Sequence, residues 1–413
     1  MCVLYMWFLQ RSKKLLFAPL WLLAVVFMTC RFISLMLIHC LQFDIFNCMS
    51  LVKPGRAISS RWKSIASLFV IDSETDFFYF QHLCRHCLRV FLTCMLYFYF
   101  NPNILVCFVC SACSPYIVNA NVDHAIGHEV LIKSRKHGFK YEWCYTFVLY
   151  ISPCICCSHP PGLWPNQHSF MHHKENNSEN DLQTLMYFRR NSVWNAVWFG
   201  IGEYVNHNFR LLAWHWNQNS IRRKNVTMCF LSWYAWWLII AMYDKLIFIK
   251  MFTCHVSTMS LLCMIIEYAQ HCLVHPNDPY NVMRNTVTCL KPNMDFVDGK
   301  LVQTRDFKFF ENIHHEHSYD ATLTFQNAID SFLKRFHTYD TDAMVFNCDY
   351  FYVFFCVVFS QWELLADVYV NKDASKMSKP EIISIIKNQV EPICSYKDIP
   401  WAKLPAWPTN MMN

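Results

Sequence analysis

Long apolar stretches alternate along this chain with polar stretches that carry most of its histidines. The apolar stretches span residues 15–38 (interrupted by Arg31), 90–118, 145–157, 228–243, 246–266 and 345–359. A membrane-crossing helix needs about 20 mostly apolar residues, and several of these stretches approach or exceed that length. The pattern therefore predicts a polytopic membrane protein built from helices.

Each apolar stretch predicts its own kind of element. Residues 15–38 are longer than the core of a signal peptide, so we expect a retained first span. The 228–243 and 246–266 stretches meet at Asp244 and Lys245, which predicts a transmembrane hairpin over 228–266.

The remaining apolar stretches are less regular. Residues 90–118 are broken at 101–103, which fits either a kinked span or a shallow hairpin. The 145–157 stretch is too short to cross untilted and predicts a re-entrant or interfacial segment. The 345–359 stretch is also short, and we expect it at the surface or packed on the protein.

The polar segments between these stretches can all face one compartment. They cover 119–143, 158–225 and 269–343, and each contains Lys and Arg, whereas the hairpin tip at 244–250 contains few. The excess of positive residues in cytoplasmic loops places them in the cytoplasm. The predicted fold class is all-α, a polytopic membrane protein with a helical, histidine-rich cytoplasmic cap. Its regions are an N-terminal membrane anchor (1–118), a core (119–343) and a C-terminal cytoplasmic or interfacial helical region (344–413).

Composition agrees with a membrane protein. Of the 413 residues, 54% are apolar and 17% aromatic, and the net charge of +6 is too modest to indicate a nucleic-acid partner. Most of the 22 cysteines lie inside apolar runs, where a thiol behaves as a small hydrophobe. They therefore do not predict a disulfide framework, which is typical of short secreted chains.

Four groups of histidines lie where the chain leaves the predicted spans. They are His124 and His128 in "HAIGH", His168, His172 and His173 in "HSFMHH", His271 with His275 in "QHCLVH", and His314, His315 and His317 in "HHEH". So many imidazoles exceed a four-ligand structural zinc site. Imidazole also binds iron, copper and nickel, and many nitrogens with few carboxylates at a membrane surface favour two non-haem irons. The other interpretation is a set of interfacial histidines without metal.

These motifs resemble the membrane fatty acid desaturases and related hydroxylases, which carry three histidine boxes and a further histidine near the last hairpin. "HAIGH" is similar to the first box and "HSFMHH" to the second. "HHKENNSENDLQTLMYFRR" resembles a subgroup pattern HHxENxxxxDLSSTxxYxRD, and "QHCLVHPNDPYNVMRNTVTC" resembles the segment QHxFVDPxDPxNxxxNSxxC. The resemblance covers about residues 120–390.

The resemblance implies a di-iron site held by the histidines that match the boxes. These metal ligands would be His124, His128, His168, His172, His173, His271, His314 and His317. Glu175 and Asn176 follow the second box and either orient its imidazoles or are a solvated or helix-capping pair. We expect Asp278 and Asn281 to shape the turn after the hairpin. The motifs identify no catalytic side chain and no organic cofactor site.

The third box departs from the pattern. Ser318 occupies the position where the subgroup has its last histidine. Either His315 replaces it, or Glu316 or water fills the position, or one iron binds weakly.

The resemblance also implies the activity and its partners. The expected reaction is O2-dependent introduction of a double bond into an acyl chain, in lipid metabolism. The alternatives are acyl-chain hydroxylation and a catalytically impaired, lipid-binding protein. Partners would be a fatty acyl lipid or acyl-CoA, membrane lipid, and a separate electron donor such as cytochrome b5 or a ferredoxin. The expected location is the endoplasmic reticulum membrane, as a multi-pass protein.

Overall fold

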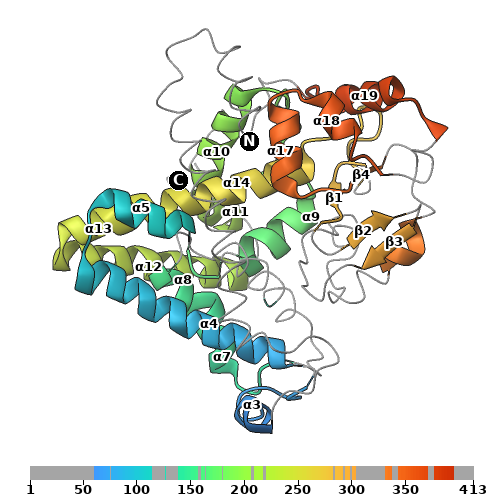
Figure 1. The fold of residues 1–413 in the computed structure, drawn as a ribbon. Helices are drawn as coiled ribbons and strands as arrows, with labels where there is room; N and C mark the ends of the chain where they lie inside the picture. Colours follow the sequence, from blue (N-terminus) through green and yellow to red (C-terminus); the bar gives the residue numbers. More distant parts are fainter. Residues whose placement is uncertain are drawn as a thin grey trace.

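A computed structural model describes most of the chain between residues 60 and 394 (Figure 1). The described residues are 60–74, 76–113, 126, 138–156, 160–162, 164–178, 180–205, 209–216, 220–281, 284–291, 294–297, 300–303, 331–336, 343–370 and 376–394. The predicted span at 15–38, the first and third histidine boxes and Ser318 lie outside them, so these predictions stay untested.

The described residues are mainly helical. Their helices, with π-helical segments labelled η, are α3 (Ser60–Ala66), α4 (Phe77–Cys94), η2 (Met95–Phe100), α5 (Ile104–Cys113), α7 (Glu142–Thr146), η3 (Phe147–Ile151), α8 (Ser152–Cys156), η4 (Trp164–His172), α9 (His173–Glu175), α10 (Val193–Val205), α11 (Leu211–Trp216), α12 (Ser220–Tyr243), α13 (Lys245–Met251), η6 (Phe252–Val256), α14 (Ser257–His271), α17 (Tyr350–Val358), α18 (Trp362–Ala366) and α19 (Lys379–Asn388).

Four short strands correct the all-α prediction. Strands β1 (Val287–Cys289) and β4 (Met344–Phe346) pair in parallel, whereas β2 (Met294–Val297) and β3 (Lys300–Gln303) form an antiparallel pair. A strand of three or four residues is too short to show a period of two against its surroundings. The mostly helical character is confirmed, but these strands were not predicted.

Two helical stretches among the described residues are long and apolar enough to cross a bilayer. They are Tyr79–Phe100, which covers most of α4 with η2, and Arg223–Tyr243, which is most of α12. The first begins well before the apolar run predicted from residue 90. Its first turns mix apolar residues with His82, His86 and Arg89, so a search for unbroken apolar sequence misses them.

The predicted helical hairpin is present. Helix α12 ends at Tyr243, and the chain returns through α13, η6 and α14, with α13 packed against α12 (Figure 1). Asp244 begins the second arm, because its Oδ1 accepts hydrogen bonds from the backbone N–H groups of Leu246 (2.7 Å) and Ile247 (3.0 Å). Such an N-cap contributes about 1 kcal/mol to helix stability.

The break at 101–103 makes a second helical hairpin. Asn101 has a left-handed backbone (φ 43°), and α5 returns beside α13 after it (Figure 1). Lys250 of α13 stabilises this turn, since its Nζ donates to Asn101 Oδ1 (2.7 Å) and Pro102 O (2.6 Å). The turn at Asn101 agrees with a hairpin and not with a single kinked span, but the first arm is longer than the shallow hairpin predicted within 90–118, and residues 114–118 lie outside the described part of the chain.

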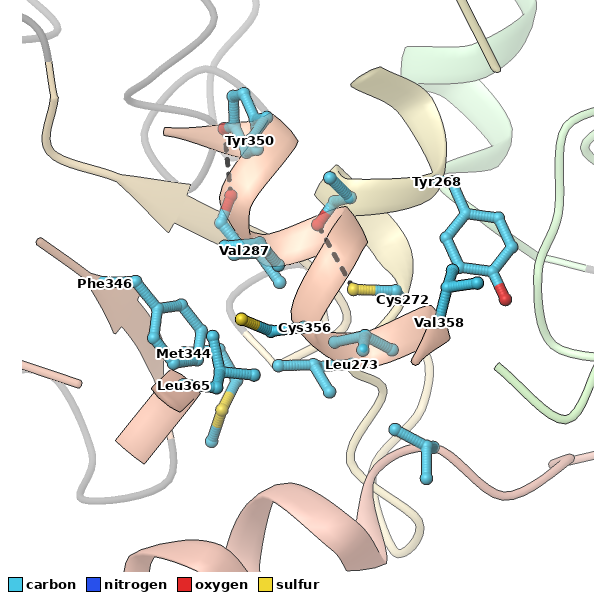
Figure 2. Packing of buried hydrophobic residues seen from close by; sticks show 14 of the residues in the cluster. Tyr268, Cys272, Leu273, Val287, Met344, Phe346, Tyr350, Cys356, Val358 and Leu365 are labelled. Atoms are coloured by element: carbon cyan, nitrogen blue, oxygen red, sulfur yellow. Dashed lines mark hydrogen bonds between the residues drawn. The ribbon is translucent and has the colours of Figure 1, made fainter. Parts of the chain in front are cut away.

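The largest hydrophobic core gathers around α14. Figure 2 shows Tyr268 of α14, with Cys272 and Leu273 just after it, packed among residues of α17, β1 and β4. Tyr350 at the start of α17 donates its hydroxyl to Val287 O of β1 (3.0 Å). The 345–359 stretch thus packs on the protein, one of the two predicted outcomes. Each large apolar side chain buried here contributes about 1.5–3 kcal/mol.

Arg190 links this core by hydrogen bonds to the segment that follows the second histidine box. Its side chain is fully buried, and within the described part of the chain the acceptors of its guanidinium are backbone carbonyls. These acceptors are Cys272 O (3.1 Å), Leu185 O (3.0 Å), Phe188 O (3.3 Å), Gln389 O (2.8 Å) and Glu391 O (2.6 Å). Burial lowers the pKa of Arg190 to about 10, which leaves the group charged at neutral pH. One side chain therefore joins three segments that lie far apart in sequence.

Candidate metal centre

The second histidine box lies on a π-helical segment. Its three imidazoles come from η4 and the first residue of α9. His168 and His172 are buried and His173 is half-buried. The ring centroid of His168 lies 5.2 Å from that of His172 and 4.5 Å from that of His173. Wider π-helical turns are rare and often occur at functional sites.

The end of α14 brings a fourth imidazole to this group. His271 is buried at the last position of α14, and its Nε2 lies 3.1 Å from Nε2 of His172. The two residues are far apart in sequence, so only the packing of α14 against the rest of the core brings them together. This is the pairing expected if both were ligands of one metal centre.

The opposite nitrogens of both rings face hydrogen-bond acceptors. His271 Nδ1 donates to the backbone carbonyl of Asn285 (2.9 Å). His172 Nδ1 lies 2.7 Å from Asp181 Oδ2. Asp181 is an acceptor on both oxygens, because Oδ2 also accepts from Asn177 N (2.8 Å) and Oδ1 accepts from Gln183 N (2.9 Å). Both imidazoles are therefore assigned a proton on Nδ1.

This tautomer assignment restricts which chemical species can lie between the Nε2 atoms of the two rings. A neutral imidazole protonated at Nδ1 has only a lone pair at Nε2. Two such lone pairs 3.1 Å apart repel each other unless a proton or a cation lies between them. Imidazole nitrogens bind divalent transition metals at about 2.0–2.1 Å, so two of them at neighbouring positions on one ion stand about 3 Å apart. The pair His172–His271 fits a metal ion in both chemistry and spacing.

The described residues supply the His172–His271 pair but not a complete set of metal ligands. Among them, no three His, Cys, Asp or Glu side chains form a group that could hold a metal ion. His124, His128, His314 and His317, with His315, Glu316 and Ser318, lie outside the part of the chain that the structure describes.

The two residues after the second box have different surroundings. Glu175 Oε1 pairs with Lys174 Nζ (3.1 Å), and its Oε2 accepts from Ser178 Oγ (3.4 Å). Asn176 ends α9 with a left-handed backbone (φ 45°), and its Nδ2 donates to Asn285 Oδ1 (3.4 Å). Asn176 therefore contacts the loop that anchors His271, whereas these contacts of Glu175 stay within its own turn.

The turn after the hairpin takes the form expected of Asp278 and Asn281. Asn281 Nδ2 donates to Asp278 Oδ2 (2.9 Å), and Arg284 Nη1 lies 3.5 Å from the same oxygen. His275, in this turn, accepts at Nδ1 from Asn277 N (3.3 Å). These contacts are local to the loop.

Sequence reasoning missed several buried polar groups, of which three are histidines or contact histidines. Asp181 and Asn285 lie in the two motifs that resemble the desaturase subgroup. Their positions in those motifs could have indicated that they contact the histidines. The third is His82 and His86 on α4, with Nε2 atoms 2.9 Å apart and His86 Nδ1 2.6 Å from Ser152 Oγ of α8. Their H-x3-H spacing equals that of His124 and His128.

Comparison with known families gives a clear result. Residues 100–301 match the family model described as "Fatty acid desaturase". This part of the chain is similar to the fatty acid desaturases. The matched region contains the first and second boxes and His271, while His82 and His86 precede it and the third box follows it. This similarity points to an oxidoreductase of the desaturase or hydroxylase type, a class that acts on acyl lipids. No curated protein and no solved structure matched the chain.

Replacing Asp181 by asparagine is expected to weaken metal binding by about 10- to 100-fold, the usual effect of losing the partner of a ligating imidazole. An amide can donate to His172 Nδ1 and so move the ring proton to Nε2, the atom that faces His271. Iron affinity of the purified protein, measured by competition with a chelator, tests this. Asp278→Asn, in the exposed turn, is the matched control and is expected to bind iron like the wild type.

Proposed function

We propose that this chain is an integral membrane desaturase that introduces a double bond into an acyl chain at a di-iron site on its cytoplasmic face. The observation that carries the proposal is the His172–His271 pair, with Nε2 atoms facing each other and both Nδ1 atoms held by acceptors. The family match over residues 100–301 supports the same chemistry.

Two iron ions, when bound, would supply the activation of O2 that side chains cannot provide for an unactivated C–H bond. The reaction R–CH2–CH2–R′ + O2 + 2 e⁻ + 2 H⁺ gives R–CH=CH–R′ + 2 H2O. The electrons require a separate donor, a cytochrome b5 or a ferredoxin. The metal ligands proposed are His124, His128, His168, His172, His173, His271, His314 and His317.

The described residues prepare this site in three ways. Asp181 and the carbonyl of Asn285 hold the tautomers that expose Nε2 of His172 and His271. Burial of these two rings excludes water from their facing nitrogens. The apolar surface of the hairpins α4–α5 and α12–α14 supports a location of the site at a bilayer, and the proposed protein is a multi-pass protein of the endoplasmic reticulum.

Two alternative functions predict different products from the same site. Hydroxylation uses the same site chemistry with removal of one hydrogen and insertion of oxygen. A lipid-binding protein with impaired catalysis is favoured by one observation, Ser318 in the place of the last histidine of the third box.

Expression in a host that lacks the product tests the proposal. Wild-type protein, His172→Ala and Ser318→His are compared by mass spectrometry of the host's acyl chains and by iron content after purification. Desaturation predicts new double bonds with the wild type and none with His172→Ala, and about two iron ions per chain.

Other results identify the alternatives. Hydroxylated chains would indicate the hydroxylase. Double bonds formed only by Ser318→His would indicate impaired catalysis, and a wild-type protein that takes up no iron under reducing, iron-replete conditions would disprove the enzyme.

A further inference from the structure

Asn285 joins the loop after α14 to the turn after the second histidine box. Its side chain is fully buried. The Nδ2 group donates to two backbone carbonyls, Asn176 O and Pro279 O, each at 3.1 Å. Its Oδ1 accepts from Asn176 Nδ2 (3.4 Å), and its backbone N–H donates to Asn281 O (3.0 Å). Both the Nδ2 group and the Oδ1 atom of this side chain therefore form hydrogen bonds.

The two ends of this bridge lead directly to the two facing imidazoles. On one side, the N–H of Asn176 donates to the carbonyl of His172 (2.5 Å), so the amide of Asn285 contacts the turn that ends the His172 helix. On the other side, the backbone carbonyl of Asn285 itself accepts from His271 Nδ1 (2.9 Å). A single residue thus contacts the helix end behind one ring and the far nitrogen of the other.

We infer that Asn285 is a positioning residue that sets the separation of the His172 and His271 Nε2 atoms. This inference rests on the proposed function, in which both atoms bind metal. The Asn285 side chain holds the second-box turn, and its carbonyl orients the His271 ring. Displacement of Asn285 therefore moves one imidazole relative to the other.

The position requires an amide. Aspartate would place a carboxylate against the carbonyls of Asn176 and Pro279, where two donors are needed. Alanine would leave both carbonyls without these hydrogen bonds, and each buried acceptor left unsatisfied costs about 1–3 kcal/mol. Serine keeps one donor on a shorter side chain and so retains part of the bridge.

Metal binding by purified protein tests the role of Asn285. Wild type, Asn285→Ala, Asn285→Asp, Asn285→Ser and Asn281→Ala are compared as full-length proteins. Iron affinity is measured by chelator competition, and the ligand geometry by the absorption spectrum of the Co²⁺-substituted protein. Asn281→Ala is the matched control, since it removes an amide of the same loop whose Nδ2 group donates to Asp278 Oδ2.

The Asn285 variants are expected to lose about 10- to 100-fold in iron affinity and to show an altered Co²⁺ spectrum, with Asn285→Ser affected least and Asn281→Ala unchanged. Where Asn285→Ala does not fold, Asn285→Ser gives the decisive comparison. Wild-type affinity and spectrum in a folded Asn285 variant would overturn the inference alone. Failure of the wild type to bind metal would overturn it together with the proposed function.

Discussion

His271→Ala is expected to reduce iron affinity at the paired imidazoles by more than about 100-fold and to abolish desaturation. Loss of a direct ligand exceeds the 10- to 100-fold effect of losing a hydrogen-bond partner of a ligand. The substitution removes one of the two facing Nε2 atoms. Iron content of the purified protein and acyl-chain analysis of the expressing host are the two measurements.

His275→Ala is the matched control for this experiment. His275 lies four residues after His271, in the loop that follows α14, and its imidazole accepts a hydrogen bond from Asn277 N (3.3 Å). The control is expected to keep wild-type iron content. Equal iron content in His271→Ala and the wild type would show that His271 is not a ligand.

Arg190→Met is expected to destabilise the protein by about 3–5 kcal/mol, a loss typical of breaking a buried hydrogen-bond network. Methionine fills much of the volume but donates nothing to the five carbonyls that Arg190 binds. Arg190→Lys is expected to be nearly as harmful, because one ammonium group cannot reproduce the spread of the guanidinium donors. The apparent melting midpoint of the purified protein in detergent measures the effect.

The neighbouring arginine provides the comparison for this experiment. Arg189 is exposed, and its Nη2 lies 3.3 Å from Glu391 Oε1 on the surface. Arg189→Met is expected to change stability by less than about 1 kcal/mol, as for other exposed ion pairs. A melting midpoint for Arg190→Met equal to that of Arg189→Met would contradict a stabilising role of the Arg190 hydrogen bonds.

The contacts of Arg190 and Asn285 also connect stability with the proposed site. Arg190 binds the segment after the second box to the end of α14 through Cys272 O. Asn285 binds the turn after the same box to the carbonyl that anchors His271. The second box and His271 are therefore held together by two buried side chains, neither of which is a histidine.

The sequence by itself determined the helical character and the hairpin that turns at Asp244. It also grouped the second histidine box and His271 in one predicted set of metal ligands. Hydrophobic period and motif order are local properties of the chain, and they can be read without coordinates. It did not reveal the helix start at Phe77, where polar residues interrupt the apolar run, or the pairing of Val287 with Met344 in β1 and β4.

Only the tertiary structure decided which atoms meet. It placed His172 Nε2 opposite His271 Nε2 and put Asp181 and the Asn285 carbonyl behind the two rings. It also buried Arg190 among carbonyls of three segments and brought His86 of α4 to Ser152 of α8. The physical reason is that a side chain's partners depend on packing between segments distant in sequence and on the direction of each ring and carbonyl. A motif specifies residue types and spacing, and neither of those properties contains this information.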